Sequence, residues 1–183
     1  QGRRALPRRS VVITIDDGYE SVHRHALPLL RRFGVPATLF VVSDFIGSRD
    51  GLSWPQLQAL VDSGLVDVQA HSRTHRNFTE RLASESEAAW RAAIEAELRQ
   101  PRELLEKRLG RPVRQLAYPY GDANEAVLGL VEAQGLTLAA TVQAGGNPFF
   151  AVPLALRRTM IFGDHDLDAF QARLQVSRGV GAP

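Results

Sequence analysis

The stretch VVITIDDGY, from Val11 to Tyr19, joins a run of apolar and β-branched residues directly to two adjacent acids and a glycine. A short apolar run of this kind predicts a buried strand over 11–15. Neighbouring carboxylates repel each other, and at least one resists ionisation unless a cation lies nearby. Asp16 and Asp17 are therefore either solvated at a surface turn or close to something positive.

The composition describes an ordinary globular protein. The length of 183 residues suits one domain with a sizeable core, and 44% hydrophobic and 23% charged residues are typical of a soluble chain. A formal net charge of +2 gives no reason to expect a nucleic acid partner. The chain has no cysteine, which excludes disulfides and thiolate ligands or nucleophiles. No apolar run approaches the ~20 residues of a membrane span, so none is predicted.

Strand and helix patterns alternate along the chain. They predict strands at 11–15, 37–42, 65–70, 114–118, 136–142 and 158–162. They predict helices at 28–33, 53–64, 84–109 with a break or kink at Pro101, 122–135, and after a cap at Asp166. This alternation is typical of a mostly parallel sheet with crossover helices, as a barrel or an open sheet.

Polar residues gather where the predicted strands end. Asp16 and Asp17 follow the first strand, His71 follows the third, and Tyr120 follows the fourth. Ligand sites of parallel α/β folds lie at the carboxyl ends of the strands, so residues far apart in sequence are expected to meet at one rim.

The segment His71-Ser72-Arg73-Thr74-His75 places two histidines four residues apart, on one face if the segment makes a helical turn. With the carboxylate of Asp17, the two imidazoles form a ligand set that suits zinc and other divalent metals. The alternative is a pair of solvated loop histidines. A metal on Asp17 would leave Asp16 ionised and able to take a proton from water. The alternative for the acid pair is a common Asp-Asp-Gly surface turn.

With these motifs in view, the chain resembles the polysaccharide deacetylase family, also called the NodB-homology domain or carbohydrate esterase family 4. The resemblance rests on Thr14-Ile15-Asp16-Asp17-Gly18, on residues 71–75, and in part on Tyr118-Pro119-Tyr120-Gly121. It covers roughly residues 10 to 175. It implies a distorted (β/α) barrel with fewer than eight strands, with a deacetylase domain at 10–177, an N-terminal extension at 1–9 and a tail at 178–183.

The resemblance also implies roles for residues. Asp16 corresponds to the general base, and Asp17, His71 and His75 correspond to the ligands of a divalent metal, usually Zn²⁺, with Co²⁺ or Ni²⁺ as alternatives. The backbone N–H of Tyr120 corresponds to a donor that stabilises the oxyanion. The implied reaction removes N-acetyl groups from an N-acetylated glycan, and the family favours an extracytoplasmic or cell-envelope location.

The chain departs from the usual family pattern near its C-terminal end. Ala117 stands where the third motif usually has arginine, and the late motifs that supply a catalytic histidine acid are not evident. This pattern is similar to the subgroup that acts on poly-N-acetylglucosamine, in which Arg158 would orient or pair with Asp16. The alternative for Arg158 is a surface arginine at a strand start. His165 is the only histidine near the C-terminal predicted strand that could replace the missing acid, and the alternative is that its segment is a loop leading to a helix cap.

Other readings stay open. His23 and His25 form an H-x-H pattern, but they precede a helix and are better explained as solvated side chains. The same site residues could hydrolyse another C–N amide, such as a cyclic imide. A degenerate domain that binds glycan without turnover is the alternative outside enzymes. The sequence does not specify the oligomeric state.

Overall fold

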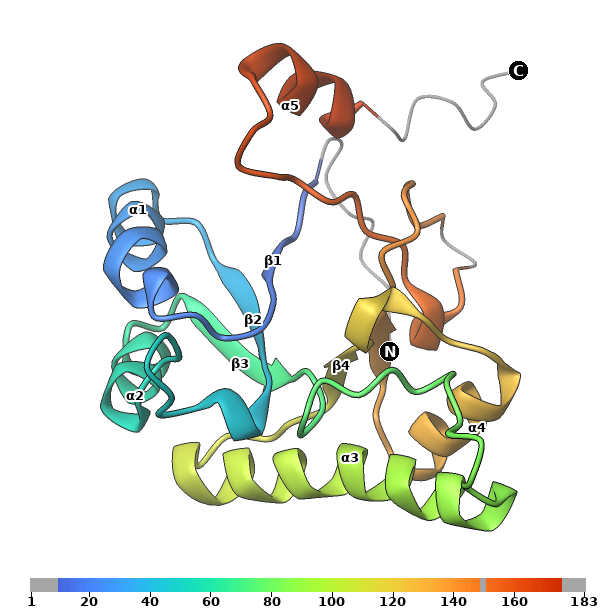
Figure 1. Ribbon diagram of the computed structural model, residues 1–183. Helices are drawn as coiled ribbons and strands as arrows, with labels where there is room; N and C mark the ends of the chain where they lie inside the picture. Colours follow the sequence, from blue (N-terminus) through green and yellow to red (C-terminus); the bar gives the residue numbers. More distant parts are fainter. Residues whose placement is uncertain (1–9, 149–150, 176–183) are drawn as a thin grey trace, which may run out of the picture.

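Five parallel strands form the centre of the structure, a computed structural model that describes residues 10–148 and 151–175 (Figure 1). The strands are β1 (Ile13–Ile15), β2 (Ala37–Val41), β3 (Val66–Ala70), β4 (Gln115–Ala117) and β5 (Leu138–Ala140). They lie in the order β1-β2-β3-β4-β5. Each strand therefore pairs with the next one along the chain.

Helices connect the strands and cover the sheet. They are α1 (Leu27–Phe33), α2 (Trp54–Asp62), α3 (Glu87–Leu109), α4 (Glu125–Ala133) and α5 (Leu167–Leu174). Four shorter helices are η1 (Val22–Ala26), η2 (Ser43–Phe45), η3 (Pro119–Gly121) and η4 (Pro153–Ala155). Helix α3 runs along the lower edge of the view, beneath the sheet, whereas α5 lies at the top (Figure 1).

The sequential strand order explains the shape of the sheet. A doubly wound sheet reverses its strand order and has helices on both faces, whereas successive right-handed crossovers in one direction curl the sheet like part of a barrel. The described strands form such a curled half-barrel. The predicted distorted (β/α) barrel with fewer than eight strands is confirmed.

The core lies between the sheet and its helices. Leu39 and Val41 of β2 are fully buried, as are Leu57 and Leu60 of α2. The capping box predicted at the start of α2 is present, with Ser53 N donating to Gln56 Oε1 at 2.8 Å. Because residues of both β2 and β3 belong to this core, it fixes the places where these strands end.

The first strand is shorter and more exposed than the sequence predicts. Only Ile13–Ile15 is a strand, and Val11 and Val12 are 65% and 79% exposed. The cause is topological: β1 pairs with β2 alone and is the edge of the described sheet. The prediction of a strand is therefore wrong for residues 11 and 12, and the prediction of burial is wrong for β1 as well, where Ile13 is exposed and Thr14 and Ile15 are half-buried.

The predicted sixth strand at 158–162 is absent from the described residues. Leu156 forms one isolated parallel bridge with Ala140, and the chain then leaves the sheet. The side chain of Asn147 bonds both the N–H and the C=O of Arg157, and Arg158 N donates to Gln143 O. These loop contacts use the backbone groups that a continued strand would need.

The long helix α3 also differs from its prediction. It begins one turn later than expected, with Ser86 as its N-cap, and it continues through Pro101 without a break. Proline removes a single backbone donor, and the buried side chains of Leu98 and Leu105 hold both halves of the helix against the core. Helix α4 likewise starts later than predicted, with Asn124 as its cap, whereas Asp166 caps α5 as expected.

No helix in residues 10–148 and 151–175 has the length and apolar character needed to cross a membrane. The predicted extension at 1–9 and tail at 178–183 lie outside the described residues.

Candidate metal centre and active site

Asp17 lies in a tight turn directly after β1. Gly18 N donates to Asp16 O at 2.9 Å, and Val42 N donates to Asp17 O at 3.1 Å, which ties the turn to the end of β2. Gly18 has φ 94°, and a Cβ there would approach Val41 Cγ1 at 3.1 Å. A glycine therefore suits both the backbone conformation and the close approach of β2.

His71 follows β3 at the same rim. Its backbone N donates to Val41 O at 2.9 Å, and its side chain is almost fully buried. Its Nδ1 lies 2.8 Å from Ala117 O at the end of β4. A carbonyl only accepts, so Nδ1 carries a proton, and in a neutral ring the lone pair is on Nε2.

His75 reaches the site through a tight loop and not through a helical turn. Residues 71–75 form no helical turn, because Ser72 and His75 have φ of 67° and 66°. A tight loop closed by a hydrogen bond from His75 N to Ser72 Oγ (2.9 Å) brings the two histidines together. Their ring centroids are 4.9 Å apart. The two histidines therefore converge as expected, through a loop and not through a helical turn.

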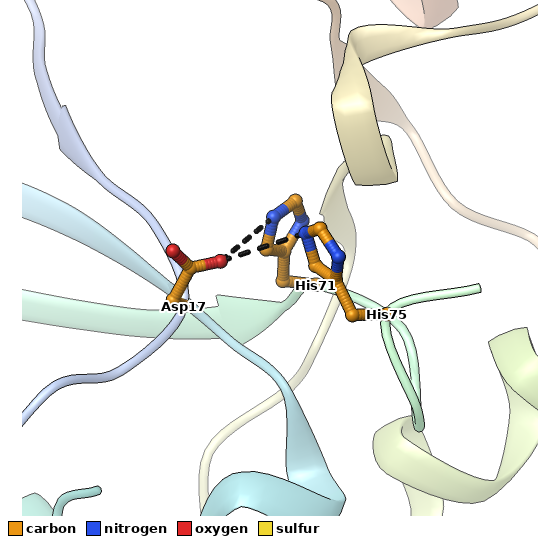
Figure 2. A group of neighbouring side chains, drawn as sticks. All are labelled: Asp17, His71 and His75. Atoms are coloured by element: carbon orange, nitrogen blue, oxygen red, sulfur yellow. Dashed lines mark ion pairs between the residues drawn. The ribbon is translucent and has the colours of Figure 1, made fainter. Parts of the chain in front are cut away.

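The three side chains Asp17, His71 and His75 point toward one another (Figure 2). Asp17 Oδ1 lies 3.4 Å from His71 Nε2 and 3.6 Å from His75 Nε2, and one ligand atom from each residue lies within 4.8 Å of the others. Tetrahedral zinc with bonds of about 2.0–2.1 Å places two of its ligand atoms about 3.4 Å apart. The spacing of these donor atoms therefore fits a divalent cation.

The hydrogen-bond pattern supports the same conclusion. The contact of His71 Nδ1 with Ala117 O turns the lone pair of Nε2 toward the carboxylate of Asp17. Two acceptors that face each other are unfavourable unless a proton or a metal ion lies between them. A backbone carbonyl that holds the second ring nitrogen is also the usual support of a metal-ligating histidine.

The protonation tendencies suit metal ligands. When His71 Nε2 carries a proton, its hydrogen bond is the largest cause that lowers the pKa of Asp17, and burial opposes the shift. Burial, followed by the nearby His71, lowers the pKa of His75. The carboxylate and the neutral imidazole are the forms that bind a metal.

Asp16 is held by Arg158. Arg158 Nη1 donates to Asp16 Oδ1 and Nη2 donates to Oδ2, both at 2.7 Å. The side chains of Arg158 and Asp16 are 11% and 21% exposed. Such a two-bond pair fixes the plane and the orientation of the carboxylate.

The guanidinium of Arg158 is itself fixed by neighbours. Its Nε donates to Thr141 O at 2.9 Å, and Nη1 also donates to Thr14 Oγ1 at 3.1 Å. It lies 5.8 Å from the ring centroid of Phe40. Arg158 is therefore a partly buried residue at the rim, and not the exposed arginine at a strand start that was the alternative.

Tyr120 lies in η3, directly after β4, with φ 59°. Its ring meets the edge of the His75 ring with centroids 4.7 Å apart, and its side chain is largely exposed. Within the described residues, no protein acceptor takes the Tyr120 N–H. The N–H is therefore available to a ligand beside the three-residue cluster.

Several residues around this site have a backbone conformation with positive φ, which is uncommon for residues other than glycine. The non-glycine residues with positive φ in the described part of the chain are Asp17, Ser72, His75 and Tyr120. Conformations of this kind cost on the order of 1–3 kcal/mol each and persist where the surroundings enforce them. Their gathering around one cluster favours a functional explanation of the cluster.

The remaining histidines lie elsewhere. His165 accepts from Phe162 N at 3.3 Å and packs on the Phe162 ring, and no contact joins it to Asp16 or Asp17 within the described chain. His25 is exposed and accepts from Arg24 Nε, and His23 lies with it in η1. None of these three histidines is among the candidate metal ligands of the described residues.

One functional candidate was missed from sequence. Glu97, in the middle of α3, accepts hydrogen bonds from the loop between His71 and His75. The sequence feature that could have identified it is its position as a glutamate on the helix face that contains Ile94, Leu98 and Leu105, all of them buried. Such a helix face normally holds apolar residues.

Comparison with known proteins identifies the family and the fold of this chain. The family described as polysaccharide deacetylase matches residues 3–139. The poly-beta-1,6-N-acetyl-D-glucosamine N-deacetylase of Staphylococcus aureus (strain MRSA252) is 29% identical over 136 residues, which cover 72% of this chain and 47% of that protein. The chain thus spans about half the length of this relative. Arg158 lies beyond the stretch that matches the family.

Solved structures share the fold. IcaB from Ammonifex degensii superposes with a TM-score of 0.77 at 26% identity, covering 94% of this chain and 75% of that one. The Streptococcus pyogenes deacetylase PplD, solved with acetate, gives a TM-score of 0.80 at 21% identity, covering 93% and 73%. With the family match extending over most of the sequence, this chain belongs to the polysaccharide deacetylase family.

Proposed function

We propose that this domain is a metal-dependent hydrolase that removes N-acetyl groups from N-acetylglucosamine units of a polysaccharide. The observation that carries the proposal is the convergence of Asp17, His71 and His75 at one rim, beside the Asp16–Arg158 pair. Family membership supports the reaction class.

The residues Asp17, His71 and His75 would hold the cation. A divalent cation held there supplies positive charge that polarises the acetamide carbonyl and makes a water molecule more acidic. Zinc is the ion we propose, with cobalt or nickel as alternatives, because two imidazoles and one carboxylate suit all three.

Asp16 acts as the general base in this proposal. Its carboxylate is fixed by two hydrogen bonds from Arg158 and still has free lone pairs, so it can accept a proton from the attacking water. Arg158 positions Asp16 and does not itself take the proton. The group that protonates the leaving amine is not assigned.

The Tyr120 N–H donates to the oxygen on which negative charge develops. It has no protein acceptor within the described chain, and the η3 turn with positive φ fixes its direction. Removing a donor of this kind typically costs about 10²–10³ in rate. The Tyr120 ring beside His75 also forms part of the site wall.

The substrate class rests on the relatives. The staphylococcal relative is named for poly-beta-1,6-N-acetyl-D-glucosamine. We propose a polymer of N-acetylglucosamine for this chain and an extracytoplasmic or cell-envelope setting for the reaction. The cyclic-imide hydrolase and the non-catalytic glycan binder remain alternatives that the same experiment tests.

The test measures acetate release from poly-β-1,6-N-acetylglucosamine, chitin oligomers and peptidoglycan fragments, with hydrolysis of a cyclic imide measured in parallel. We expect acetate from an N-acetylglucosamine polymer with wild-type protein and at least ~10²-fold less with Asp16→Asn. Imide hydrolysis without acetate release would support the first alternative. Glycan binding without any turnover would support the second.

A further inference from the structure

The loop that carries the two histidines is held by one buried carboxylate. Glu97 Oε2 accepts from Arg73 N at 3.0 Å and from Thr74 N at 2.9 Å, and its Oε1 accepts from Thr74 Oγ1 at 2.8 Å. Both residues lie between His71 and His75. The carboxylate thus takes the place of the secondary structure that this segment lacks.

The opposite side of the loop is bonded to η2. Ser43 N donates to Ser72 O at 3.2 Å, and Asp44 N donates to Arg73 O at 3.0 Å. The loop is therefore fixed from two directions, by η2 on its carbonyl side and by Glu97 on its N–H side. The backbone between the two histidines has little freedom left.

The burial of Glu97 is unusual for its chemistry. The residue is 8% exposed and shares its helix face with Ile94 and Leu98. Buried carboxylates are normally paired with a cation or fully hydrogen-bonded. Within the described chain, Glu97 forms no ion pair with arginine or lysine, and its bonded partners are the donors of this loop.

The loop also needs external support, because it contains strained residues. Ser72 and His75 both have positive φ. Without Glu97, the amides of Arg73 and Thr74 would be free to turn toward water, and the loop would relax toward ordinary backbone conformations. His75 would then leave its position beside Asp17.

We infer that Glu97 is a positioning residue that preorganises the loop of His71 and His75 for metal binding. The inference rests on the proposed function, since it requires that Asp17, His71 and His75 bind a cation. The hydrogen bonds of Glu97 go to the backbone of Arg73 and Thr74 and to the Thr74 hydroxyl, so it acts on the two histidines through the loop between them.

Two substitutions separate hydrogen bonding from charge. In Glu97→Gln the amide oxygen can still accept both backbone N–H groups, and the amide nitrogen can donate to Thr74 Oγ1. In Glu97→Met a side chain of similar volume offers no oxygen acceptor. Glu95→Met, at an exposed position of the same helix, is the matched control.

The experiment measures the Kd for Co²⁺ by competition with a chromophoric chelator, together with the thermal midpoint of each metal-free protein. Groups that orient metal ligands are typically worth about 10–100-fold in affinity, and we expect Glu97→Met to weaken binding by this factor. Glu97→Gln should stay within about 3-fold of wild type because its hydrogen bonds persist. Glu95→Met should bind as wild type does.

Each outcome has a distinct meaning. If wild-type protein binds no cobalt, the proposed function fails and this inference fails with it. If wild type binds cobalt and folded Glu97→Met binds it equally well, the positioning role alone is refuted. Binding as weak in Glu97→Gln as in Glu97→Met would refute the hydrogen-bond argument. If Glu97→Met does not fold, Glu97→Asp, too short to reach both amides, must show the weakened binding.

Discussion

Replacing Arg158 with methionine tests how far Asp16 depends on its partner. The substitution keeps much of the side-chain volume and removes both 2.7 Å hydrogen bonds to the carboxylate. Asp16 would then be free to rotate and to bind water at the open side of the rim. Our account predicts a loss in kcat with little change in metal content, because Arg158 does not contact the proposed ligands.

The size of the effect follows from the geometry. Hydrogen bonds to charged groups contribute about 1.5–3 kcal/mol each, and water compensates part of this loss at a carboxylate that is 21% exposed. A net loss of about 3 kcal/mol corresponds to a rate reduction of about 10²-fold. Arg158→Lys keeps the positive charge but cannot form the two parallel hydrogen bonds of the guanidinium, so we expect kcat to fall by about 10-fold.

The assay is acetate release under saturating substrate, with metal content measured on the same samples. Arg157→Met is the matched control, because Arg157 is the adjacent arginine and is exposed. It should retain wild-type kcat. If Arg158→Met turns over at the wild-type rate while Asp16→Asn is inactive, the orienting role of Arg158 is refuted.

Two further predictions concern the surroundings of the site. Gly121 has φ 76° and an added Cβ would meet Val142, so Gly121→Ala should lower the free energy of unfolding by about 2 kcal/mol or more. Gly129 lies on α4 with open space around it, so Gly129→Ala should raise the free energy of unfolding slightly. Denaturant titrations measure both changes. The hydrogen bond from Arg76 holds the pKa of Glu85 below its ordinary value of 4.5, so the unfolded chain binds more protons as the pH falls past 4.5. The contribution of this pair is therefore present above pH 4.5 and is lost as the pH falls through the lowered pKa of Glu85. The thermal midpoints of Glu85→Gln and wild type should differ at pH 7 and approach each other as the pH falls below 4.5.

The sequence predicted the convergence of the site because one topological rule sufficed. Asp17, His71 and Tyr120 each follow a strand, and parallel strands present their carboxyl ends at one edge. The rule needs only the order of strands and helices, which the apolar pattern and the capping residues indicate.

The features of the structure that differ from the sequence prediction depend on tertiary contacts. The spacing of His71 and His75 fits one face of a helical turn, but the segment has positive φ at Ser72 and His75 and is bonded to η2 and α3 instead. The prediction of a sixth strand was wrong because the side chain of Asn147 bonds the backbone of Arg157, where sheet pairing would otherwise continue. No local pattern in the sequence reports such partners.

The missed role of Glu97 has the same origin. A glutamate on the apolar face of a helix indicates a buried acceptor, but its donors lie more than 20 residues away in the loop at 71–75. The partner of a buried polar group is chosen by the fold. Only the structure joins the helix to the histidine loop.

The central claim is that Asp17, His71 and His75 bind a divalent cation on which deacetylation depends. The most direct measurement is acetate release from poly-β-1,6-N-acetylglucosamine before chelation, after chelation, and after one equivalent of zinc is returned. The account predicts that activity is lost on chelation, recovers with one zinc ion per chain, and does not recover in His75→Ala. Full activity in chelated protein whose metal content is zero would contradict the account.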